Sequence, residues 1–138
     1  MSGNLPDVDL TVAGPFVAAM KFVVTEASGS RVVGSVELGP DHHTPWGVVH
    51  GGVYCSVVES AASIGASTAV LEHGQFAVGV NNNTDFLRAM TEGRVDVVAE
   101  PIQQGRTQQL WQVSLTRDDG KLVARGQVRL QNVALPGA

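Results

Sequence analysis

The sequence predicts an α+β fold in which one curved antiparallel sheet wraps around a long central helix. The helix is indicated by residues 51–73, a run rich in Ala and Ser that has no turn signal before Gly74 and is too long for one strand. Because this run is apolar on nearly every face, we expect the helix to be buried. Such a helix must be covered on more than one side, which a curved sheet achieves.

Two strands are predicted before the helix. Residues 20–27 and 31–38 are rich in Val and other residues that favour strands, and the Ser-Gly-Ser segment 28–30 separates them. This pattern predicts a hairpin. A loop at residues 39–47 then leads toward the helix.

Four strands are predicted after the helix, at residues 76–88, 94–100, 110–116 and 122–131. In the last three, apolar and polar side chains alternate, which is typical of antiparallel strands with one face in solvent. Turn-forming sequences separate them, and the Asp-Asp-Gly turn at 118–120 is a strong hairpin signal.

The chain of 138 residues has the length of one domain and can fold on a hydrophobic core alone. Residues 1–8 are polar and contain Pro6, so we expect a flexible N-terminus there and a single domain over residues 9–138. The single cysteine, Cys55, excludes an intrachain disulfide framework and a multi-cysteine zinc site.

The charge and the hydropathy of the sequence indicate where the protein is located and which classes of partner it binds. The net charge is −4 without any basic block, which argues against nucleic acid as a partner. The first twenty residues contain no Lys or Arg, unlike a secretory signal. No uninterrupted apolar run reaches the roughly 18 residues that span a bilayer. We therefore expect a cytoplasmic protein with no membrane partner.

The start of the helix and one acidic residue carry the candidate chemistry. If the helix begins at Gly51 and Gly52, its first amides are free at the positive end of the dipole and can bind a carbonyl oxygen that becomes negative. Glu59 follows among apolar and small residues, where an ionised carboxylate costs free energy unless it is paired. This cost favours a catalytic role, with a structural acid bonded to a loop or a subunit as the alternative.

Geometry requires a dimer for such a site. The eight residues from Gly51 to Glu59 span about 12 Å of helix, so both groups of one chain cannot contact the same carbonyl. In a two-fold dimer with antiparallel helices, the start of one helix can face Glu59 of the other, which creates two equivalent sites.

Four segments occur in a fixed order: GVVHGG at residues 47–52 followed by Glu59, VNNNTDFLR at 80–88, QGRTQQLW at 104–111 and DDGKLVARGQVRL at 118–130. Together they resemble the hotdog-fold acyl-CoA thioesterases, in particular the phenylacetate-pathway (PaaI-like) and 4-hydroxybenzoyl-CoA types. The resemblance covers roughly residues 16–132. It implies hydrolysis of an acyl-CoA thioester by a homodimer or homotetramer, with no metal and no cofactor, since CoA is part of the substrate.

The resemblance also implies roles for individual residues. Glu59 is the nucleophile or general base, the Gly51 N–H is the oxyanion donor, and Ser63 orients the water. Relatives often carry Asn or Gln three residues before Gly47, where it polarises the thioester carbonyl or holds the water.

This chain has Thr44 at that position. Either Thr44 or a loop histidine must then supply the contact, and the candidates are His42, His43 and His50. His50 is equally explained as a residue that holds the loop by hydrogen bonds. The spacing of the three histidines is not that of a zinc site.

CoA carries a 3′-phosphate and a pyrophosphate, which arginines and backbone amides bind well. Arg88, which closes the FLR segment, and Arg106 in the GRT segment are the candidates, with Gly52 as a backbone contact that allows close approach.

Two other functions on the same fold remain open. A non-catalytic acyl-CoA binding module would bind CoA esters without releasing CoA. A hydroxyacyl dehydratase would use a histidine and an acid together, for which His50 and Glu59 are available. The sequence does not distinguish an aliphatic from an aromatic acyl group in the substrate. The serine-hydrolase elbow and nucleotide phosphate loops are excluded because neither G-x-S-x-G nor G-x-G-x-x-G occurs.

Overall fold

The computed structural model describes residues 14–137. In this part of the chain, the helices are α1 (Pro15–Ala19), η1 (Pro40–His42), α2 (Gly51–Val70) and η2 (Leu71–His73), of which η1 and η2 are 3₁₀ helices. The strands are β1 (Phe22–Ala27), β2 (Val32–Leu38), β3 (Gln75–Phe86), β4 (Gly93–Gln104), β5 (Gln108–Arg117) and β6 (Leu122–Ala134). The predicted helix and all six predicted strands are confirmed. The sequence did not predict α1 and η1, and the predicted N-terminus 1–8 lies outside the described residues.

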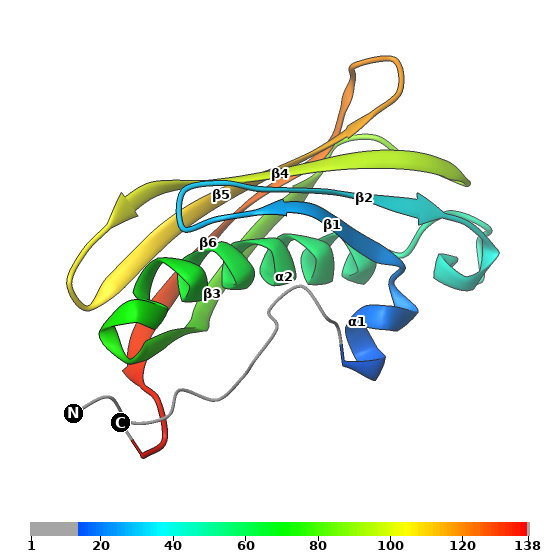
Figure 1. Ribbon diagram of the computed structural model, residues 1–138. Coiled ribbons are helices and arrows are strands. Elements are labelled where there is room, and N and C mark those ends of the chain that lie inside the picture. The colour runs from blue at the N-terminus through cyan, green and yellow to red at the C-terminus, as the bar shows by residue number, and fades with distance from the viewer. Residues whose placement is uncertain (1–13, 138) are drawn as a thin grey trace.

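The six strands form one antiparallel sheet in the order β1-β2-β4-β5-β6-β3, and α2 lies along one of its faces (Figure 1). The predicted fold class is therefore confirmed. The hairpins β1–β2 and β5–β6 form as predicted. The turn at 91–93 instead joins β3 to β4, which are not neighbours, because β3 pairs with β6 at the edge of the sheet.

Bulges bend the sheet around α2. The register shifts in four of the strand pairs, with one extra residue between Val24 and Glu26 of β1, Gly79 and Asn81 of β3, Pro101 and Gln103 of β4, and Leu122 and Ala124 of β6. An extra residue in one strand bends that strand and increases its twist. The curvature lets one sheet cover the length of a 20-residue helix.

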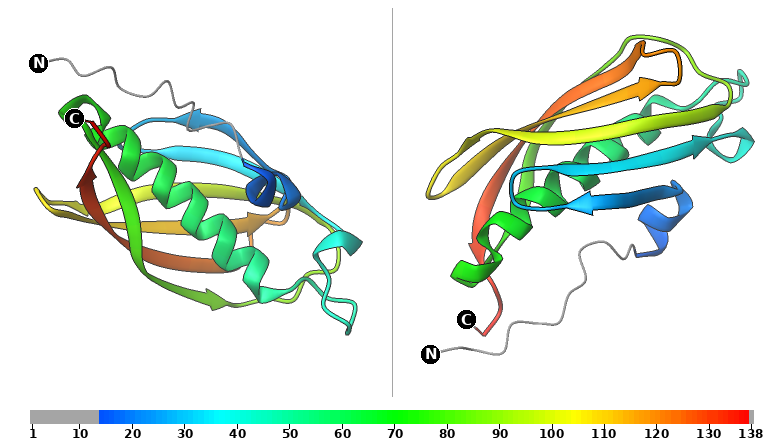
Figure 2. Two further views of the ribbon diagram at one scale, coloured as in Figure 1. Left: turned by 90° about the horizontal axis from the view of Figure 1, so that it is seen from below. Right: turned by 45° about the horizontal axis from the view of Figure 1, so that its top comes forward.

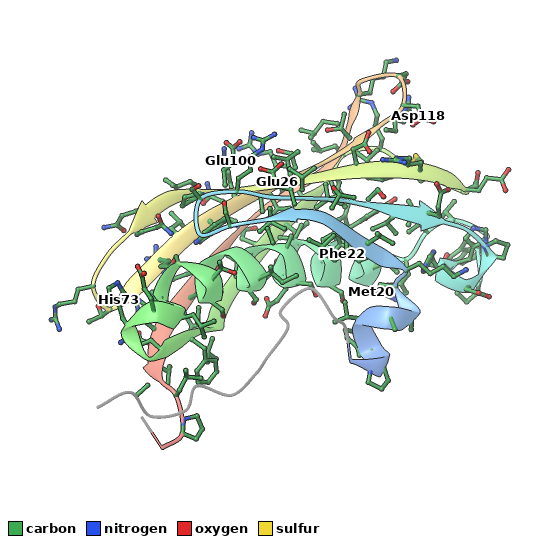
Figure 3. The ribbon with its side chains drawn as sticks, viewed as in Figure 1. Met20, Phe22, Glu26, His73, Glu100 and Asp118 are labelled. Atoms are coloured by element: carbon green, nitrogen blue, oxygen red, sulfur yellow. The ribbon has the colours of Figure 1, made fainter. Side chains whose placement is uncertain are left out.

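The core lies between the sheet and α2. Trp111 of β5 is fully buried, and its ring lies so close to Gly65 of α2 that a Cβ at Gly65 would be 2.4 Å from it. A glycine therefore lets the helix sit close to the sheet over this large ring. Phe22 of β1 points toward the helix, whereas Glu100 of β4 lies on the outer face of the sheet (Figure 3).

The sheet covers α2 on one side only. That side carries buried residues such as Tyr54, Val58 and Ala62. The opposite side, seen in the left view of Figure 2, carries half-exposed and mostly small residues, namely Gly52, Ser56, Ser60 and Ser63. The expectation of burial on nearly every face is therefore wrong for a single chain, because the short α1 touches only part of this open side.

By length and composition, Gly51–His73 is also long and apolar enough to cross a membrane. The prediction from the sequence concerned uninterrupted apolar runs, which Glu59 interrupts, whereas the average composition of the helix tolerates a charged residue. In the fold, half of the apolar window is buried. This packing against a sheet is that of a core helix.

A buried polar network closes the core at the C-terminal end of α2. Gln109 of β5 is 1% exposed, and its Nε2 donates to Ala66 O at 2.9 Å and to Asn132 Oδ1 at 2.8 Å. Its Oε1 accepts from Trp111 Nε1 at 2.8 Å. Asn132 Nδ2 in turn donates to the backbone oxygen of Arg106 at 3.2 Å. The network ties the β4–β5 turn to α2.

Candidate functional site

Helix α2 begins at Gly51, as predicted, and His50 is its N-cap residue. The Nδ1 of His50 accepts a hydrogen bond from the Gly52 N–H at 2.8 Å. The Gly52 amide is therefore not free, contrary to the expectation from the sequence. Among residues 14–137, no acceptor pairs with the Gly51 N–H. One free amide is thus available at the positive end of the helix dipole.

Position 51 has no room for a side chain. A Cβ at Gly51 would lie 2.4 Å from the ring of Phe86, which ends β3. The ring of Phe86 also packs against Tyr54, with 5.7 Å between ring centroids. Glycine therefore keeps the first amide of α2 next to β3, and a ligand can approach the backbone closely.

The three loop histidines have different environments. His42 is buried, its Nδ1 accepts from the Gly39 N–H at 3.2 Å, and its Nε2 has no partner among the described residues. His43 donates from Nε2 to Thr91 O at 2.5 Å. His50 is exposed, and because its Nδ1 accepts, the proton of the neutral ring is on Nε2. His42 and His43 hold the loop, and His50 keeps a donor at the surface.

Thr44 lies in a tight turn that precedes the helix. Its N–H donates to Val48 O at 2.7 Å, and its carbonyl accepts from the Gly47 N–H at 3.0 Å. Its Oγ1 accepts from the Trp46 N–H at 3.2 Å. The hydroxyl proton of Thr44 is still available, so this side chain can donate one hydrogen bond to a ligand.

Glu59 lies on the half-exposed side of α2 and faces β3. Its Oε1 accepts from Asn82 Nδ2 at 3.1 Å. Its Oε2 lies against Gly79, where a Cβ would be 2.6 Å away. Two residues of β3 thus determine the position of this carboxylate: Asn82 donates a hydrogen bond to it, and Gly79 leaves the space that it occupies.

An open hollow lies in front of Glu59. The other residues that line it are Phe16, Cys55, Ser56, Ser60 and Asn82. Phe16 comes from α1, and 70% of it is exposed. Ser63 is half-exposed one helical turn after Glu59. A carboxylate in such a place can take a proton from water or attack a carbonyl carbon.

Arg88 and Arg106 lie toward opposite ends of α2. Arg88 follows β3 next to the start of the helix, and its Nη1 donates to Leu122 O at 2.7 Å. Arg106 lies between β4 and β5 and lines a second hollow together with His73. Figure 3 shows His73 at the other end of the helix. One chain therefore does not bring the two arginines to one site.

One chain also separates the two central groups, because Gly51 and Glu59 are about 12 Å apart along the helix axis. Within residues 14–137, no group of three or more His, Cys, Asp or Glu side chains is placed to hold a metal ion.

The sequence did not single out Asn82 or Thr84. Asn82 Nδ2 donates to Cys55 O at 3.0 Å as well as to Glu59, and Thr84 Oγ1 donates to Asn82 Oδ1 at 2.7 Å. A signal was present, because the run NNNTD makes a predicted strand polar on both faces. A polar residue on the inward face requires a partner there.

Comparison with solved structures places this architecture among the hotdog folds. A thioesterase from Haemophilus influenzae aligns over 98% of this chain and 94% of its own, with a TM-score of 0.84 and 25% identity. A structure of a "putative esterase" from Mycobacterium tuberculosis aligns over 88% of this chain and 98% of its own, with a TM-score of 0.85 and 44% identity.

Sequence comparison gives the family. The thioesterase superfamily matches residues 47–124. The M. tuberculosis protein is 45% identical over 126 residues, which is 90% of each chain. A 1,4-dihydroxy-2-naphthoyl-CoA hydrolase of Listeria monocytogenes is 34% identical over 101 residues, which is 73% of this chain and 80% of the hydrolase. The chain belongs to the thioesterase superfamily, which confirms the predicted resemblance.

Proposed function

We propose that the protein is an acyl-CoA thioesterase that hydrolyses the thioester to a free acid and CoA. The observation that carries this proposal is the placement of Glu59, a carboxylate held by β3 in an open hollow of a thioesterase-superfamily fold. The hydrolase activity of the Listeria relative on an aromatic CoA ester supports an acyl-CoA substrate.

The proposed active form is a homodimer in which two β3 strands and two α2 helices meet. β3 is a 12-residue edge strand that lies next to α2, and Val78 and Val80 are exposed along it (Figure 2). An edge strand of this length favours pairing with another strand. The small residues on the open side of α2 allow a second helix to approach closely. Antiparallel helices then bring Glu59 next to the partner subunit's Gly51.

In the proposed reaction, the partner subunit's Gly51 N–H donates to the thioester oxygen as it becomes negative. Glu59 either takes a proton from the attacking water or attacks the carbonyl carbon itself, forming an anhydride that water then hydrolyses. Both routes break the bond between the carbonyl carbon and sulfur and release CoA as the thiol. Ser63 orients the water, and the Thr44 hydroxyl or His50 Nε2–H supplies a further donor to the carbonyl.

The CoA phosphates are assigned to Arg88 and Arg106. Because these residues lie near opposite ends of α2, an antiparallel dimer can place Arg88 of one chain and the partner's Arg106 on the same side of a site. The Gly52 amide already donates to His50. The proposed contribution of Gly52 is therefore only its missing side chain, which lets CoA come close to the backbone. We propose that the reaction uses no metal or cofactor and takes place in the cytoplasm. The complete assembly is proposed to be a homotetramer, without a nucleic-acid or membrane partner.

Thiol release from a panel of aliphatic and aromatic acyl-CoAs tests the proposal. We expect turnover by the natural protein and a loss of at least about 100-fold in Glu59→Gln. The matched control is Glu72→Gln, since the Glu72 side chain is 82% exposed on η2. The Cys55 thiol must be subtracted as background. Wild-type rates in Glu59→Gln would contradict the proposal, and CoA-ester binding without any turnover would favour the binding module.

A further inference from the structure

The bulge in β3 decides which asparagine faces Glu59. Gly79 pairs with Leu130 and Asn81 with Arg129, so β3 contains one extra residue at this point. Beyond the bulge, Asn82 and Thr84 turn toward α2, whereas Asn81 and Asn83 are exposed. Bulges next to functional sites often redirect a side chain in this way.

A short chain of hydrogen bonds then fixes the Glu59 carboxylate. Thr84 Oγ1 donates to Asn82 Oδ1 at 2.7 Å, and Asn82 Nδ2 donates to Glu59 Oε1 at 3.1 Å. Because Oδ1 accepts from the hydroxyl, the amide nitrogen must face the carboxylate. The second hydrogen bond of Nδ2, to Cys55 O at 3.0 Å, fixes the amide against the helix backbone.

Two glycines make room for this chain. A Cβ at Gly126 of β6 would lie 2.4 Å from Thr84 Oγ1, and a Cβ at Gly79 would lie 2.6 Å from Glu59 Oε2. Gly126 is the direct neighbour of Thr84 across the β3–β6 pair. The glycines therefore leave space for the Thr84 hydroxyl at one end of this series of hydrogen bonds and for the Glu59 carboxylate at the other.

We propose that Asn82 is a positioning residue for Glu59 and that Thr84 sets the orientation of its amide. This inference rests on the proposed thioesterase function. Asn82 engages Oε1 and leaves Oε2 as the oxygen that meets water or the thioester carbon. Both proposed routes require Glu59 to act as an acceptor or nucleophile, and the hydrogen bond from Asn82 matches that role.

The test compares Thr84→Val with Thr84→Ser, and Asn82→Asp with Asn83→Asp. Thr84→Val keeps the size of the side chain but removes the donor to Asn82, so we expect kcat to fall at least about tenfold with KM nearly unchanged. Thr84→Ser restores the hydroxyl and is expected to recover most of that loss. Asn82→Asp replaces the donor by a second carboxylate and is expected to lower kcat further, whereas Asn83→Asp changes the exposed neighbour and leaves kcat within about twofold.

A second measurement does not depend on turnover. The side-chain amide protons of Asn82, identified by their loss in Asn82→Asp, are expected to show a hydrogen-bonded NMR shift that changes in both Glu59→Ala and Thr84→Val. If the natural protein hydrolyses no acyl-CoA but this signature is present, the proposed function fails and the contact stands. The positioning role is overturned if Asn82→Asp retains the natural kcat, if Thr84→Ser loses as much as Thr84→Val, or if the amide shift does not respond to Glu59→Ala.

Discussion

The carboxylate of Glu59 on α2 lies directly against the backbone of Gly79 on β3. A Cβ added at Gly79 would be 2.6 Å from Glu59 Oε2 and 3.2 Å from Glu59 Cδ. The neighbouring atoms belong to the end of a flexible side chain, so the carboxylate has to move if a side chain is present at Gly79. The position of the candidate catalytic group therefore depends on a glycine in another element.

Gly79→Ala is expected to lower kcat for thioester hydrolysis by about 10- to 100-fold while the fold is retained, because an added methyl group displaces the carboxylate. Thiol release and a thermal unfolding curve measure the two effects separately. Asn81→Ala, at an exposed position of the same strand, is the control. Natural activity in Gly79→Ala would show that the carboxylate position in this chain is not the catalytic one.

Gln109→Met is expected to lower the free energy of unfolding by roughly 2–4 kcal/mol. The change keeps the size of the side chain but leaves Trp111 Nε1, Asn132 Oδ1 and Ala66 O without this partner in a buried place. Urea unfolding gives the value. Gln112→Met on the exposed face of the same strand is the control, with an expected change within about 0.5 kcal/mol. Equal midpoints for the two variants would contradict a structural role of the network.

The sequence was sufficient for the central helix and the six strands because their signals were local. Helix α2 and η2 end at Gly74, a left-handed residue with φ 71°, and the alternation in β4 and β5 matches their burial. The strand order was not predictable in this way. β3 pairs with β6, which lies far along the chain, and no local pattern encodes that pairing.

The site was predicted only in part, for a similar reason. Gly51 and Glu59 belong to one helix, and their spacing could be read directly. Asn82 was missed because the bulge after Gly79 reverses which residues of β3 face inward, and a bulge has no fixed sequence signal. The free amide of Gly52 was expected wrongly because the N-cap role of His50 depends on its side-chain conformation.

Tyr54 is the only tyrosine in the sequence, and its hydroxyl is buried without a hydrogen-bond partner among the described residues. Burial raises the pKa of Tyr54 above its usual value of 10.0. Absorbance titration of the folded protein should therefore give a midpoint above that of the protein in denaturant.

The same shift has a consequence for stability. The neutral hydroxyl is favoured in the folded state, so the contribution of Tyr54 is complete below about pH 10 and is lost as the pH rises through the folded pKa. Tyr54→Phe should show a smaller loss of stability in this alkaline range. At pH 7 it should match or exceed the natural protein by up to about 1 kcal/mol, because an unpartnered hydroxyl is removed. A steeper alkaline loss in Tyr54→Phe would contradict the burial argument.

The proposed dimer places Cys55 opposite its own copy. If Gly51 of one antiparallel helix faces Glu59 of the other, the residue midway between them lies at the two-fold axis, and that residue is Cys55. A short bismaleimide should therefore link two native chains into a covalent dimer, as seen by denaturing electrophoresis. Cys55→Ser should abolish the product. In the Cys55→Ser background, Ser60→Cys should give far less product, because ten residues of helix, about 15 Å, then separate the two thiols. Efficient linkage through Ser60→Cys but not through Cys55 would rule out this helix register and, with it, the proposed shared site.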